Sequence, residues 1–145
     1  MIVGNDGLNT VRAMYGMVDQ MRIYAGTLPT VAQLSTPPGT LLVDFQNDIQ
    51  NASDNSFFIN ASKQVQWQFA DMNAERSYAQ ADAINSGTAG FFWLTVVSDN
   101  YDYSTIAGTI GGIGSGADLE LPSTSIAAGD VVKFQSLIIN LDIFS

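Results

Sequence analysis

The chain has 145 residues, so we expect one domain spanning 1–145. Hydrophobic residues make up 46% and charged residues only 13%, which predicts a packed core and a surface that is partly buried against partners. Five Lys and Arg residues against 14 Asp and Glu residues give a formal charge of −9, which disfavours binding to nucleic acid or to an anionic membrane. Without Cys or His, the sequence excludes disulfides, thiol chemistry, imidazole bases and the usual structural zinc sites.

The first ten residues show no basic region followed by an apolar run, so we expect no signal peptide. No apolar stretch approaches the roughly 20 residues that span a bilayer, so we expect no membrane insertion.

Residues 7–21 predict a single N-terminal α-helix, because their apolar positions recur at the spacing of one helical face. Gly16 lies in the middle and weakens such a helix by about 1 kcal/mol relative to Ala. The methionines of this segment, Met14, Met17 and Met21, are our candidate partner-contact surface, because methionine adapts to irregular surfaces. The alternative is a helix packed on the core of its own chain.

Downstream, the pattern changes to alternation typical of strands, separated by turns rich in Gly, Asn, Asp and Ser. We predict strands within 21–26, 40–46, 56–60, 63–69, 88–99, 101–112, 117–122 and 131–144, the last as one bent strand or two. Residues 88–99 are apolar almost throughout, which predicts burial on both faces. Residues 27–40 hold three of the four prolines, which predicts an extended connection. Residues 70–87 are predicted to be irregular, with a possible short strand or helix. The expected fold is mainly β: an antiparallel β-sandwich or jelly roll with one N-terminal helix.

Residues 108–121, "GTIGGIGSGADLEL", contain a match to the dinucleotide-binding pattern G-x-G-x-x-A from Gly112 to Ala117. That fingerprint requires a helix after the glycines, whose N-terminus faces the pyrophosphate. Here the sequence alternates like a strand and is then interrupted by Pro122, and the lysine of a P-loop is absent. We therefore interpret the glycines as a tight turn between strands and expect no cofactor.

Asp118 and Glu120 lie two apart on a predicted strand, so their side chains would share a face. Paired carboxylates can hydrolyse glycosides, but acids beside inward-facing leucines are more often a solvated strand face. A serine nucleophile would have no base in a chain without His. We expect a protein that is not an enzyme.

Two oxygen-rich turns could hold Ca²⁺, although neither has EF-hand spacing and we expect no metal site. Their acidic and amide residues are Asp99, Asn100 and Asp102 in one turn and Asp48, Asp54 and Asn55 in the other. Trp67 and Trp93 lie in apolar strands and are expected in the core, whereas Tyr101 and Tyr103 are expected nearer the surface. These tyrosines and the acidic turns would form the site of an alternative function, carbohydrate or receptor binding.

Two blocks of the sequence carry a family resemblance. They are "MRIYAGTLPT…PPGTLLVDF" in 21–45 and "SGTAGFFWLTVVSD…IAGTIGGIGSGADLELPSTSIAAGDVVKFQSLIINL" in 86–141. They resemble a family of small tailed-bacteriophage virion proteins with "LRIY-G-P", "GTLL", "GTA-FR" and "G-VG-GSGADL-L-ST-I-AG--V" segments. The resemblance implies a β-sandwich subunit of the virion, assembled in the host cytoplasm and decorating or cementing the capsid, with a tail or fibre position as the alternative.

The chain departs from the family pattern within 47–85, which is longer and more polar, and at Trp93, where the family has Arg. The family offers no catalytic motif to transfer. We therefore expect a non-enzymatic structural protein whose partners are the major capsid protein and identical copies, arranged as a homotrimer.

Overall fold

The computed structural model of the chain describes residues 3–4, 17–45, 57–59, 65–68, 79–97, 103–134 and 136–139. Within these ranges the protein is mainly β, with one short 3-10 helix and no α-helix. The strands are β1 Val3–Gly4, β2 Met17–Ala25, β3 Thr40–Asp44, β4 Phe57–Ile59, β5 Val65–Gln68, β6 Ala79–Asp82, β7 Gly87–Val97, β8 Tyr103–Gly112, β9 Leu119–Leu121, β10 Ser125–Ile126, β11 Val131–Phe134 and β12 Ser136–Ile139; the 3-10 helix η2 is Val31–Gln33.

The largest sheet has the order β1-β8-β7-β2-β3, with β9 added beside β8 and β10 beside β7. Its centre is the long pairing of β2 with β7, which runs from Met17 opposite Val97 to Ala25 opposite Ala89. Two smaller sheets pair β11 with β6 and β12 with β5 and β4. Every pair among the described strands is antiparallel except β8 with β9.

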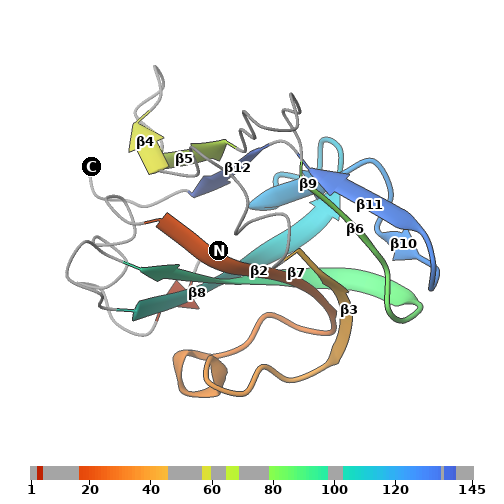
Figure 1. Cartoon of the computed structure of the whole chain (residues 1–145), viewed down its shortest axis with the longest axis horizontal. Helices are drawn as coiled ribbons and strands as arrows, with labels where there is room; N and C mark the ends of the chain where they lie inside the picture. The colour runs from red at the N-terminus through yellow and green to blue at the C-terminus, as the bar shows by residue number, and fades with distance from the viewer. Residues whose placement is uncertain are drawn as a thin grey trace.

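Alternation along the central strands divides their side chains between two apolar clusters. On one face, Met21 and Ile23 of β2 pack with Phe92 and Leu94 of β7 in the main core. Ala81 of β6 and Val132 of β11 cover this core from the other side. Figure 1 shows β6, β11 and β12 lying on this side of the large sheet, opposite the orange connection between β2 and β3.

The other face of the same strands carries a second cluster of Tyr24, Leu34, Phe91, Trp93 and Ala107. Leu34 comes from the connection between β2 and β3, which therefore lies over this face of the sheet (Figure 1). The rings of Tyr24 and Phe91 stack with their centroids 5.1 Å apart. Residues 91–95 of β7 are all buried, so both faces of this part of the strand are covered, as its nearly continuous apolar sequence predicts.

The predicted N-terminal helix over 7–21 is wrong for its last part, since Met17–Met21 belong to strand β2. The backbone of 17–21 pairs with β7 over this stretch, with a register shift between Val18 and Gln20. The remainder, 7–16, lies outside the described residues. Met21 is fully buried in the main core, so it is not available to a partner, while Met14 lies outside the described residues.

The other predicted strands are found at their expected positions. The long C-terminal segment, left open as one bent strand or two, forms two strands, β11 and β12. In the ambiguous stretch 70–87, the described part from 79 onward contains the short strand β6 and the first residue of β7. The connection 27–40 contains the 3-10 helix η2 in addition to extended backbone, and Thr30 with Gln33 closes the start of that helix as a capping box.

Candidate partner-binding surfaces

The glycine-rich segment connects two parallel neighbours, β8 and β9. Ile110 pairs with Leu119 and Gly112 with Leu121, so the chain must turn back on itself within the residues between Gly112 and Leu119. The amide of Ser115 donates to the carbonyl of Gly112 at 3.0 Å, which closes a tight turn. Gly114 and Gly116 have φ of +83° and +79°, values that favour glycine over residues with a Cβ. The prediction of a backbone-driven turn is confirmed.

Glu120 holds this turn from the neighbouring strand β9. Its two carboxylate oxygens accept hydrogen bonds from the amides of Gly114 and Gly116, each at 3.0 Å. These bonds to Gly114 and then Gly116 hold the pKa of the Glu120 carboxyl below its ordinary value, because they favour its charged form. The amides that would cradle a phosphate in a dinucleotide site are therefore occupied by the protein's own carboxylate.

Asp118 connects the same turn to β8 through hydrogen bonds with Thr109. Its Oδ2 accepts from the Thr109 amide and from the Thr109 hydroxyl, both at 2.9 Å, and the Asp118 amide donates to Thr109 Oγ1 at 3.1 Å. Asp118 is buried whereas Glu120 is exposed, and the two carboxylates bind different parts of the fold. They do not form the paired arrangement that carboxylate catalysis of glycoside hydrolysis requires.

Ile113 lies at the apex of this turn and is 73% exposed. Three other large apolar residues of the described ranges are also exposed, namely Val31, Ile84 and Val131. Ile113 is the most exposed of them, and the turn around it is closed by hydrogen bonds on both sides. The result is an exposed apolar side chain on a turn that is held by hydrogen bonds.

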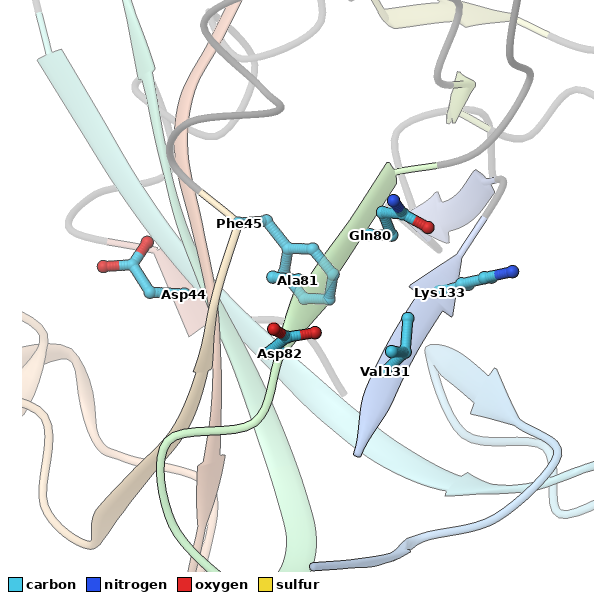
Figure 2. A pocket seen from close by; sticks show the side chains of 7 residues that line it. All are labelled: Asp44, Phe45, Gln80, Ala81, Asp82, Val131 and Lys133. Carbon is cyan, nitrogen blue, oxygen red and sulfur yellow. The ribbon is translucent and has the colours of Figure 1, made fainter. Parts of the chain in front are cut away.

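One hollow among the described residues has a volume of about 750 Å³ and lies between β3 and the β6–β11 pair. It is lined by Asp44, Phe45, Gln80, Ala81, Asp82, Val131 and Lys133. Figure 2 shows the Asp44 carboxylate pointing away from β6 and β11, and the Lys133 ammonium pointing away from Asp82. The charged groups at this hollow do not converge on one point, as catalytic groups would.

A second, smaller groove of about 350 Å³ lies on the other side of β11. One wall is the continuous run from Asp130 to Lys133, and the other is formed by residues of 121–126. Leu121 and Ile126 are buried and Val132 is half-buried, so the floor of the groove is apolar. Because consecutive residues of β11 line it, the edge of β11 that faces away from β6 borders this groove.

A charged pair lies beside the second apolar cluster. Arg22 Nε is 3.2 Å from Asp44 Oδ2, and the Arg22 guanidinium lies 5.2 Å from the centre of the Trp93 ring. Partial burial lowers the pKa of Arg22, but hydrogen bonding to Tyr24 and the charge of Asp44 raise it, and the net direction is upward. The ion pair joins β2 to β3, and the contact of Arg22 with Trp93 joins β2 to β7.

The remaining sequence-derived candidates fall into two groups. Trp93 is 8% exposed and lies in the core as expected, whereas the side chains of Met17, Trp67 and Tyr103 are not described. Both predicted oxygen-rich turns and Tyr101 lie outside the described residues. Among the residues that are described, no cluster of three or more His, Cys, Asp or Glu side chains is arranged to hold a metal ion.

Neither the Ile113 apex nor the groove beside β11 was singled out by the sequence. The glycines on both sides of Ile113 indicated a turn, but nothing in the pattern indicated that its isoleucine would be exposed. The groove joins residues of β9, β10 and β11, whose arrangement depends on the tertiary fold.

None of the helical segments described in the chain is long and apolar enough to cross a membrane. Comparison of the chain with protein-family models, curated proteins and solved structures gave no match.

Proposed function

We propose that this chain is a non-enzymatic structural protein of a tailed-bacteriophage virion. In this proposal it is a β-sandwich of jelly-roll type that decorates or cements the capsid shell by binding the major capsid protein and identical copies. It assembles in the host cytoplasm and acts by binding alone, as a homotrimer.

The observation that carries the proposal is where the two blocks of the family resemblance lie. Residues 21–45 contain most of β2 and all of β3, and 86–141 contain β7 to β12. The two blocks, far apart in sequence, meet in the longest strand pairing of the fold, β2 with β7. The resemblance therefore covers one structural unit and not two unrelated segments.

The quoted "GSGADL" segment has a local structural role that suits this interpretation. Its glycines form the turn after β8, and its aspartate, Asp118, fixes the turn to Thr109. Glu120, just beyond it, closes the turn. In the part of the chain that is described, these carboxylates serve the fold, which favours a binding protein over an enzyme.

The first experiment is the number of copies of this chain per purified particle, measured by quantitative mass spectrometry against the major capsid subunit. We expect hundreds of copies, as a position on the shell requires. A few to a few dozen copies would instead place the chain in the tail, collar or fibre and favour receptor binding. Absence from the particle would reject the structural proposal.

A second experiment tests shell binding directly. Particles made without this chain are mixed with the purified protein and sedimented. We expect the protein to sediment with the particles up to a fixed stoichiometry. Protein that stays in the supernatant at every concentration would contradict a decorating or cementing role.

A further inference from the structure

Strand β3 lies at the end of the largest sheet among the described strands, so one of its two edges has no strand of that sheet beside it. An edge strand can pair with a strand of another molecule, which leads to uncontrolled self-association. The segment from Thr40 to Phe45, "TLLVDF", is apolar apart from Thr40 and Asp44 and contains neither Pro nor Gly. Short segments of this composition are typical of strands that aggregate when their edge is open.

The connection between β6 and β7 covers this edge of β3. The backbone amide of Ile84 donates to the carbonyl of Leu42 at 2.7 Å. The side-chain amide of Asn85 donates through Nδ2 to the carbonyl of Leu41 at 2.9 Å. Two carbonyls that a strand of another molecule would use as acceptors are therefore already bonded within the chain.

An irregularity in β3 places both carbonyls within reach of the same connection. In a regular strand the carbonyls of consecutive residues point to opposite edges. Here the pairing of β2 with β3 shifts register, because Ile23 is opposite Val43 and Tyr24 is opposite Leu41. Leu42 is the extra residue on β3 at this point. Such bulges are themselves a means by which proteins protect sheet edges.

The covering connection is bonded on its other side to the turn that precedes β11. The amide of Ala83 donates to the carbonyl of Asp130 at 2.8 Å, and the amide of Gly129 donates to the carbonyl of Ala83 at 2.9 Å. The amide of Ala128 donates to the hydroxyl oxygen of Ser86 at 2.9 Å. Residues 83–86 are therefore held between the β3 edge and a second part of the fold.

We infer that residues 83–86 form an edge clasp, which keeps β3 from pairing with the same strand of a second copy of this chain. A second copy is the partner that the clasp excludes, because two opened β3 edges would present the same apolar segment to each other, as identical segments do in cross-β assemblies. The inference goes beyond the proposed function, since it concerns the free chain and holds whether or not the chain joins a particle.

The variant Asn85→Ala tests the clasp, because it removes the donor to Leu41. Ser123→Ala is the matched control: it removes a side-chain donor of the same kind, the exposed Ser123 hydroxyl that bonds the carbonyl of Ser125 at 3.1 Å, but away from β3. Both full-length variants are incubated at equal concentration and followed by light scattering and thioflavin T fluorescence. We expect Asn85→Ala to self-associate at least threefold faster than Ser123→Ala.

A second substitution shows whether the association uses the β3 edge. Thr40 is exposed at the start of β3, and Thr40→Lys places there the kind of charge that opposes edge pairing. It also moves the formal charge of −9 closer to zero, which by itself favours association. We expect the double variant Asn85→Ala, Thr40→Lys to return to the wild-type rate, because the effect of the lysine on the edge is local.

Hydrogen exchange of the unmodified protein provides a measurement that does not depend on any variant. We expect the Ile84 amide to be protected from exchange, and to exchange at least tenfold faster in Asn85→Ala, while circular dichroism verifies that the variant is folded. An Ile84 amide that is unprotected in the wild-type protein would overturn the inference. Equal association rates of Asn85→Ala and Ser123→Ala would also overturn it, as would faster association that Thr40→Lys does not reverse.

Discussion

The indole N–H of Trp93 donates a 2.9 Å hydrogen bond to the backbone carbonyl of Leu34, although the two residues are 59 positions apart in the sequence. Leu34 is 2% exposed, so its carbonyl has no access to bulk water. This bond fastens the connection between β2 and β3 over the second apolar cluster.

Replacing Trp93 with Phe removes this donor and leaves the Leu34 carbonyl buried without it. We expect the free energy of unfolding to fall by about 1–3 kcal/mol, the usual cost of an unsatisfied buried polar group. Urea unfolding followed by circular dichroism measures the change. Val31→Ala, on the same connection but exposed, is the control, and equal effects of the two substitutions would contradict the role of the hydrogen bond.

The Glu120 carboxyl is expected to titrate below the ordinary glutamate pKa, because Gly114 and Gly116 donate to its charged form. A lowered pKa in the folded protein means that the stabilising contribution is present above the unfolded-state value of about 4.3 and is lost as the pH falls through the folded value. NMR titration of the Glu120 side chain and of the two glycine amides measures this pKa. If the chemical shifts of the two glycine amides titrate with an ordinary glutamate pKa, the hydrogen bonds between Glu120 and these amides do not form.

Asp118 and Thr109 are expected to be energetically coupled. Asp118→Asn, Thr109→Val and the double variant form a thermodynamic cycle that isolates their interaction. Because the Asp118 carboxylate is buried and accepts two bonds from Thr109, we expect a coupling energy of about 1–3 kcal/mol in urea unfolding. Additive effects of the two single substitutions would mean that the bonds contribute little to stability.

Gly90 is expected to tolerate no side chain. A Cβ at this position would overlap the backbone carbonyl oxygen of Gly26, where β7 passes close to the end of β2. We expect Gly90→Ala to lower the free energy of unfolding by about 1–3 kcal/mol or more, as overpacking does. Gly112→Ala is the matched control, because a Cβ there meets nothing within 4 Å. If thermal unfolding shows Gly90→Ala to be as stable as Gly112→Ala, the close approach of Gly90 to the Gly26 carbonyl is contradicted.

The sequence by itself determined most of the strand positions and the burial of both faces of β7 over residues 91–95. The alternation of apolar and polar residues, and the run of aromatic and β-branched residues in β7, are patterns among residues that are adjacent in the sequence. They can therefore be recognised without knowledge of the fold. It also determined that the glycine match is a turn, because alternation and Pro122 follow where a helix would be needed. The absence of His and Cys, with the chemistry that this excludes, is likewise a property of composition.

Only the tertiary structure decided the assignment of Met17–Met21 to a strand. Their apolar spacing is compatible with both helical and strand periods, and the hydrogen bonds of β2 with its neighbours come from distant parts of the chain. Such non-local pairing overrides a modest local preference for helix. The bonding of Glu120 to the turn, the exposure of Ile113 and the groove beside β11 were decided in the same way, since each depends on which strands become neighbours when the sheets assemble.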